Sequence, residues 1–249
     1  MRRVLIPLAA IAGAIVCWQA AVASGLVPNY LLPSPVQVVV ALVDDWQLLC
    51  AHAGTTLAEA AIGLVFGVAC GFAAAVAMER FEGLYLALSP LITISQTIPT
   101  VAIAPLLVLW LGYGWMPKIV LIAITTFFPI AVSLTSGFKA VDPDVVDMMR
   151  AMGASRWSIF RHAQLPGAVG GFFSGLKISA TYAIVGAVIA EWLGGDAGLG
   201  VYMTRVRKSF SYDRMFAVII VISALSLVLI KIVEALQRLC TPWMQTDKD

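Results

Sequence analysis

The stretch "DPDVVDMMRAMGASRWSIFRHAQLPG", residues 142–167, decides how the rest of the chain has to be interpreted. It is charged and carries residues that cap and end short helices, although Asp, Glu, Lys and Arg make up only 12% of the 249 residues. The chain as a whole is 61% hydrophobic, whereas roughly half of a soluble domain is apolar. We therefore expect a bilayer to be the solvent for most of the chain, with this stretch lying outside it.

Apolar runs on either side of this stretch are long enough to cross a membrane, which takes roughly 20 residues per helix. Six runs qualify, at 4–23, 55–78, 84–111, 118–138, 167–190 and 214–237. They are continuous rather than alternating and too long for barrel strands. The prediction is an all-α membrane protein with six transmembrane helices in a single domain, 1–249. The first run also fits a cleavable signal peptide, but its length favours a retained helix.

The Lys and Arg residues predict the orientation. With the N-terminus inside, nine lie on the cytoplasmic side (Arg2, Arg3, Arg80, Lys139, Arg150, Arg156, Arg161, Arg238 and Lys248) and five outside (Lys118, Arg205, Arg207, Lys208 and Arg214). The positive-inside rule then places both termini and the loop 139–166 in the cytoplasm. The cluster "TRVRKSF", residues 204–210, opposes the rule, so this outer loop is either structured or wrongly assigned.

Composition excludes several classes of function. The net charge is +2, and basic residues occur singly or in pairs beside the spans, which is not the pattern of a nucleic-acid-binding face. The four cysteines form no CxxC pair, and no cluster predicts a metal site. The sequence also lacks the GxxxxGK[ST] phosphate-binding loop, so we expect no cofactor and no bound ATP.

Two spans carry small residues at four-residue spacing, which lets helix backbones approach closely in lipid. One ridge is Gly63, Gly67 and Gly71; the other is Gly171, Gly175, Ser179, Ala183 and Ala187. Such ridges serve either ordinary contacts within one bundle or a pathway or subunit interface.

The third span predicts a break, because it contains Pro90, Pro99 and Pro105. Four polar residues lie at that break: Ser95, Gln96, Thr97 and Thr100. Irregular backbone at membrane depth is tolerated where it lines a cavity, so a translocation pathway is one interpretation. The alternative is a kinked helix whose hydroxyls bond back to its own carbonyls.

Other polar residues inside the spans are also candidates for the pathway. Glu59 and Glu191 lie near the outer ends of their spans, where they face either the pathway or the lipid headgroups. Thr181 and Tyr182 offer small hydrogen-bonding groups within the fifth span.

The opening stretch itself predicts two short amphipathic helices. Asp142 is suited to the N-cap and Pro143 to the first helical position, while Gly153 can end the first helix. Ser155 can cap a second helix, which we expect Pro166 to stop before the fifth span. The apolar side of this pair would lie in the membrane interface or fill a groove on a soluble partner.

These features resemble the permease subunits of binding-protein-dependent ABC importers, whose loop carries Glu-Ala-Ala, three residues, Gly, nine residues, Ile, one residue and Leu-Pro. Here Asp147-Met148-Met149 departs from Glu-Ala-Ala and Ala163 replaces Ile, whereas Gly153 and Leu165-Pro166 match. Further stretches such as "SQTIPTVAIAPLLVLWLGYG" and "GAVIAEWLGGDAGLG" look like the branch importing nitrate, sulfonates, taurine and thiamine-pyrimidine precursors.

The resemblance implies a type I importer fold with a coupling-helix pair between the fourth and fifth helices, in the bacterial inner membrane. It implies two copies of the chain, two ATP-binding subunits and an extracytoplasmic solute-binding protein. The residues expected to couple to the ATPase are Asp147, Arg150, Gly153, Ala154, Ser155, Trp157, Phe160, Leu165 and Pro166.

The alternatives are a secondary transporter and a membrane enzyme. A secondary transporter would favour inverted repeats and buried ionisable groups at the midplane, where only Lys177 qualifies. An enzyme would need an acidic partner for Ser155 and His162, and capping already explains Ser155. We expect no enzymatic activity, and a thiamine-pyrimidine or similar heterocyclic precursor as the solute, ahead of a sulfonate, taurine or nitrate.

Overall fold

The computed structural model describes residues 2–25, 27–28 and 31–242, with side chains from residue 5 onward. Lys248, counted above on the cytoplasmic side, lies outside these residues, as do the side chains of Arg2 and Arg3. The described part of the chain contains helices and no strand, as the apolar runs predict.

Long apolar helices form the body of the molecule. They are α1 (Arg2–Ala23), α3 (Trp46–Arg80), α6 (Trp115–Lys139), α9 (Leu165–Gly194) and α11 (Tyr212–Cys240). A sixth span is a bent pair, α4 (Glu82–Ser95) and α5 (Thr100–Leu111), whose axes meet at 99°. The predicted run 84–111 is therefore not one straight helix, because Pro99 has no N–H to continue the helical bonding from α4.

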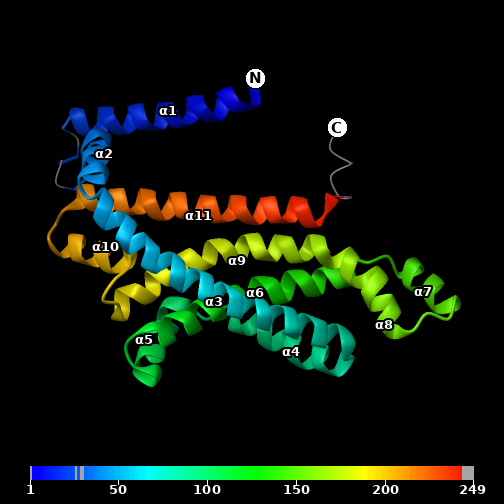
Figure 1. Cartoon of the computed structure of the whole chain (residues 1–249). Helices are drawn as coiled ribbons and strands as arrows, with labels where there is room; N and C mark the ends of the chain where they lie inside the picture. Colours follow the sequence, from blue (N-terminus) through cyan, green and yellow to red (C-terminus); the bar gives the residue numbers. More distant parts are fainter. Residues whose placement is uncertain (1, 26, 29–30, 243–249) are drawn as a thin grey trace.

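Short helices lie at the two ends of the bundle (Figure 1). One end carries α7 (Pro143–Ala151) and α8 (Arg156–Ile159), and the other carries α2 (Pro35–Asp44) and α10 (Leu199–Lys208). This separation is expected if residues 139–166 and the cluster 204–210 lie on opposite sides of a membrane.

The core is built where α6 packs between α3 and α9, and the small-residue ridges make this possible. A Cβ on Gly71 would lie 2.8 Å from the carbonyl oxygen of Phe127 on α6, and one on Gly175 would lie 2.7 Å from that of Pro129. Both ridges thus serve helix contacts within one chain, the first of the two alternatives.

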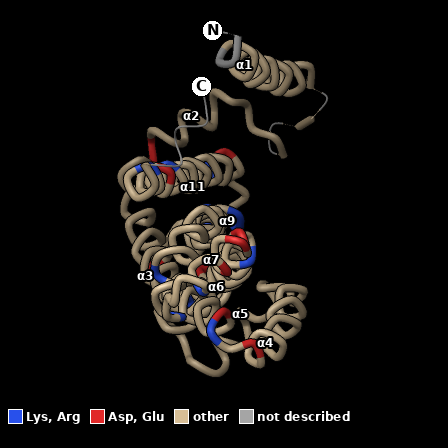
Figure 2. The backbone as a smooth tube through the Cα atoms, turned by 90° about the vertical axis from the view of Figure 1, so that its right-hand side faces the viewer, with Lys and Arg blue, Asp and Glu red and all other residues tan. Residues whose placement is uncertain are grey.

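The first helix lies apart from this core (Figure 2). It meets the rest of the chain mainly near its C-terminal end, where the Trp18 ring lies 5.6 Å from that of Phe216 on α11. The Trp18 Nε1–H also donates to the Pro33 carbonyl at 3.1 Å. Most of α1 therefore remains exposed in a single chain, as expected of a surface that faces lipid or another subunit.

Candidate functional site

The loop 139–166 has the capped helices that its sequence predicts. The Asp142 carboxylate accepts a hydrogen bond from the Asp144 N–H at 2.9 Å, and Pro143 occupies the first turn of α7. Ser155 accepts from the Ser158 N–H at 3.2 Å and so caps α8. Ser155 is therefore a capping residue, which agrees with the argument against a catalytic serine.

The bend between α7 and α8 depends on Gly153. Its φ is +81°, in the left-handed region that a β-branched side chain rarely adopts. The Gly153 and Ala154 N–H groups donate to the Arg150 and Met149 carbonyls at 2.9 and 3.0 Å, which closes the C-terminus of α7. A single glycine thus fixes the direction in which α8 leaves α7.

The apolar side of the helix pair is uncovered by the described chain. Met152 is 78% exposed, Trp157 67% and Met148 58%. Asp147 and Arg150 form an exposed ion pair of 2.8 Å on the same helix. Large exposed apolar side chains on a rigid, charged element are typical of a surface that binds another protein.

The other side of this element is anchored to the bundle. The Gln164 amide donates to the Glu79 carboxylate at the end of α3 at 2.6 Å, and the Phe160 ring packs 5.8 Å from that of Phe138. The expectation that Pro166 stops the second helix is wrong, because a π turn (Phe160–Gln164) joins α8 directly to α9. Its extra residue lets the backbone pass Pro166, which lacks an N–H, without a break.

The break between α4 and α5 is a sharp bend whose polar side chains bond back to the carbonyls of α4. The bend is far sharper than a proline kink, and Gln96 and Thr97 are exposed. At the same time, Ser95 Oγ and Thr97 Oγ1 donate to the Ile92 and Ile94 carbonyls at 2.9 and 2.7 Å. The Gln96 amide also donates to the Ile92 carbonyl, at 3.5 Å, so these side chains satisfy the last carbonyls of α4.

The predicted pathway residues fall into three places. Ser95, Gln96, Thr97 and Thr100 surround the break. Thr181 and Tyr182 lie on α9, where the Tyr182 side chain is 49% exposed. Glu59 and Glu191 are buried at 0% and 1% exposure, in a separate cluster.

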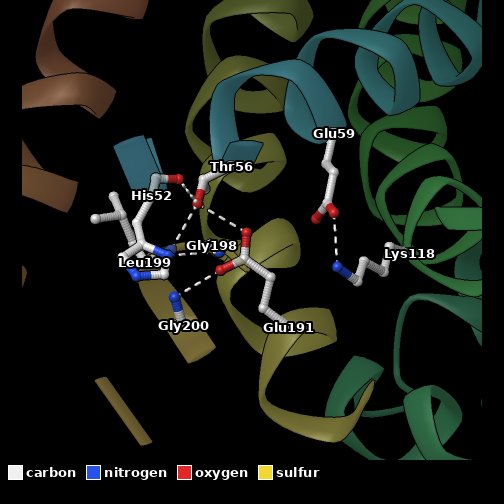
Figure 3. Close-up of polar contacts among 8 residues, drawn as sticks. All are labelled: His52, Thr56, Glu59, Lys118, Glu191, Gly198, Leu199 and Gly200. Atoms are coloured by element: carbon white, nitrogen blue, oxygen red, sulfur yellow. Dashed lines mark hydrogen bonds and ion pairs between the residues drawn. The ribbon is translucent and has the colours of Figure 1, made fainter. Parts of the chain in front are cut away.

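That cluster holds the N-terminus of α10 (Figure 3). His52 Nδ1 accepts from the Gly198 N–H at 3.0 Å, Thr56 Oγ1 from Leu199 at 2.9 Å, and Glu191 Oε2 from Gly200 at 2.5 Å. These are donors that a helix leaves without intrahelical partners, and a carboxylate is favoured beside them. Side chains of α3 and α9 therefore cap α10.

A buried ion pair completes the cluster. Lys118 Nζ lies 2.6 Å from Glu59 Oε1, with side-chain exposures of 6% and 0%. The second oxygen, Glu59 Oε2, has no hydrogen-bond partner among the described residues. Lys118 was assigned to the outer aqueous side, yet it is buried within the bundle and neutralises Glu59.

A second contact fixes the middle of α10. The Tyr202 hydroxyl donates to Asp45, whose carboxylate also pairs with Arg214 at 3.1 Å. Burial, followed by the Asp45 carboxylate, raises the pKa of Tyr202 well above its usual range. The segment that carries most of the basic cluster is thus a well-fixed helix, so it is structured, as one of the two alternatives expects.

Sequence reasoning missed His52, Thr56, Lys118 and the amides of Gly198 to Gly200. A signal was present in part, since His52, Thr56 and Glu59 follow a helical i, i+4, i+7 pattern and so share one face of α3. The pattern does not reveal which distant elements this face meets.

A bundle of long apolar helices with a broken span, and with capped helices projecting at one end, defines a multi-pass membrane protein. Residues 63–246 match the family described as "Binding-protein-dependent transport system inner membrane component". The chain belongs to this family and is a multi-pass inner-membrane permease of the ABC importer class, as its loop and apolar runs predict.

Two relatives and a solved structure support this assignment. The chain is 34% identical over 215 residues to a formylaminopyrimidine transport permease protein of Halalkalibacterium halodurans, covering 86% of each chain. It is 31% identical over 236 residues to a riboflavin transport system permease protein of Chloroflexus aurantiacus, covering 92% of this chain and 86% of the relative. The fold matches a structure of the methionine ABC transporter in an inward-facing conformation, with TM-score 0.69 and 20% identity, over 78% of this chain and 96% of that one.

Proposed function

We propose that this chain forms the translocation pathway of an importer for a small heterocyclic vitamin precursor of the thiamine-pyrimidine type. The observation that carries this choice is the near full-length similarity to permeases named for formylaminopyrimidine and riboflavin, both nitrogen heterocycles. Sulfonates, taurine and nitrate remain the competing solutes.

Energy would come from separate ATP-binding subunits bound to the loop 139–166. The exposed side chains of Met148, Met152 and Trp157 supply an apolar surface for them, and Gly153 sets its angle. The π turn makes this surface continuous with α9, so a displacement of the loop would move that helix as a rigid body.

The pathway would form between two copies of the chain, each contributing the break at Ser95–Thr100 and the face of α9 with Thr181 and Tyr182. The exposure of Gln96 and Tyr182 in a single chain supports this proposal. Glu59 and Glu191 would contribute indirectly, by holding α10 against α3 and α9 at the end of the path. Solute recognition itself would belong to an extracytoplasmic binding protein.

The test is uptake into proteoliposomes that contain the purified permease, its ATP-binding subunit and its solute-binding protein. Radiolabelled formylaminopyrimidine, riboflavin and taurine are compared at equal concentration, with ATP or a non-hydrolysable analogue inside. We expect ATP-dependent uptake of the pyrimidine, and stronger binding of the pyrimidine than of taurine by the binding protein. Uptake driven by an ion gradient without the ATP-binding subunit would instead identify a secondary transporter.

A further inference from the structure

A pocket between α3, α4 and α6 has no role in the proposed pathway or in the contact with the ATP-binding subunits. It has a volume of about 150 Å³, and its lining includes Lys139, the last residue of α6 before the loop that leads to α7. Its lining residues are Met78, Tyr85, Ser89, Ile92, Thr93, Ala131, Val132, Thr135, Ser136 and Lys139. One water occupies about 30 Å³ in the liquid, so the space exceeds what a single water needs.

The pocket has a cation that forms no ion pair with a carboxylate of the described residues. Lys139 Nζ lies 3.7 Å from the centroid of the Tyr85 ring, and no carboxylate of the described residues lies within 4.0 Å of it. Glu79, an acidic residue nearby, accepts the Gln164 amide instead. Glu79 is within electrostatic reach of Lys139, but it makes no ion pair with it, so the ammonium can still contact an anionic ligand directly.

Hydroxyl groups beside this cation differ in what they can still bind. Thr93 and Thr135 donate to the carbonyls of Ser89 and Ala131, at 3.0 and 2.7 Å. The Ser136 hydroxyl has no partner among the described residues, and it lies on α6 one turn before Lys139. An ammonium and a hydroxyl on adjacent turns together suit an oxyanion such as phosphate.

The order of lining residues along α6 favours a lipid over a free anion. On α6 the lining changes from Lys139 at the helix end through Ser136 and Thr135, whose hydroxyl bonds to its own helix, to the apolar Val132 and Ala131. Position 139 also directly precedes the exposed loop, so charge lies at the membrane boundary and apolar surface lies deeper. An amphiphile with a phosphate head and an acyl tail has the same order.

We propose that this pocket binds the phosphate of an anionic lipid of the cytoplasmic leaflet, with Lys139 and Ser136 as its ligands. Basic pockets between transmembrane helices on that side are suited to such headgroups. The choice of leaflet rests on the orientation in the proposed function, but binding by the pocket does not.

The test is native mass spectrometry of the detergent-purified chain after incubation with phosphatidylglycerol or with phosphatidylcholine. Two variants alter the pocket differently: Lys139→Gln removes the charge, and Val132→Phe fills the space while leaving Lys139 in place. The matched control is Lys231→Gln on α11, another exposed lysine, which is paired with Glu234 at 2.8 Å. Thermal unfolding of each variant confirms that it is folded.

We expect the parent chain to retain one phosphatidylglycerol and to prefer it over phosphatidylcholine. Lys139→Gln should weaken retention roughly fivefold, the effect of one basic residue near an anionic lipid. Val132→Phe should weaken lipid retention too, and Lys231→Gln should behave as the parent.

Equal retention by Lys139→Gln and the parent would overturn the proposal. Displacement of the lipid by millimolar inorganic phosphate would overturn it as well, because the pocket would then be a site for free anions. Neither outcome bears on transport, so the importer proposal is judged separately.

Discussion

The buried pair of Glu59 and Lys118 offers a quantitative test of how the outer end of the bundle is held together. Their charged atoms lie 2.6 Å apart, and neither side chain is more than 6% exposed. Removing one partner of such a pair leaves an uncompensated charge away from water, which costs about 3–5 kcal/mol.

The two single substitutions should not be equal. Lys118→Met leaves Glu59 beside Glu191, which is itself within electrostatic reach of both members of the pair. Two buried carboxylates then share one site, so we expect the full loss of about 3–5 kcal/mol in the free energy of unfolding. Glu59→Gln leaves Lys118 with Glu191 as a remaining counter-charge, so we expect a smaller loss of about 1–3 kcal/mol.

The double variant Glu59→Gln/Lys118→Met removes both charges and should be less destabilised than Lys118→Met alone. The measurement is the free energy of unfolding in mixed micelles, from which the four proteins give a coupling energy. The control cycle is Asp147→Asn with Arg150→Gln, an ion pair of 2.8 Å whose members are 68% and 66% exposed. Its coupling should stay below about 1 kcal/mol. Additive effects at the buried pair would show that the two charges do not stabilise one another.

Four further predictions follow from the fold and the loop. Gly153→Val should abolish co-purification of the ATP-binding subunit while membrane insertion survives, whereas Gly153→Asn should retain co-purification because asparagine tolerates positive φ. Normal uptake by the valine variant would contradict the role of the bend. Thr97→Trp should block uptake, while size-exclusion chromatography still shows an assembled complex. Gln96→Leu should slow uptake without changing the solute affinity of the binding protein. Full uptake with tryptophan at position 97 would place the pathway elsewhere. Gly67→Ala should lower thermal stability because its Cβ would meet Thr126 and the Ala123 carbonyl, whereas Gly13→Ala meets nothing within 4 Å and should be neutral. Single cysteines at Ser155 and Ser209, in a chain without its four native cysteines, should be labelled from opposite sides of the membrane; labelling from one side would refute the six-span orientation.

Local features of this chain could be predicted because their causes lie within a few residues. The bend at Gly153, the caps at Asp142 and Ser155 and the apolar character of the long helices all depend on neighbours in sequence. The family resemblance added the class of protein, which the matching of residues 63–246 confirms.

Tertiary features could not be predicted in the same way. Glu59 and Lys118 are 59 positions apart, and nothing local pairs them. The prolines of the third span predicted a break but not its 99° angle, which depends on packing against α6 and α9. Pro166 was expected to end a helix, because the π turn that accommodates it has no simple sequence signal.

The two ends of the molecule are joined by one helix, which connects the loop 139–166 to the buried cluster around α10. At its N-terminus α9 continues through the π turn into the loop 139–166, and at its far end Glu191 accepts the Gly200 N–H of α10. The 30 residues of α9 span about 45 Å, enough to cross the hydrocarbon core. A movement imposed on the loop would reach Glu191 without a flexible joint. Helix α3 also caps α10, through His52 and Thr56. If α9 moves relative to α3, α10 can follow only one of these two helices, and its buried hydrogen bonds to the other helix must break. The cap on α10 should therefore resist separation of α9 from α3 at this end of the bundle.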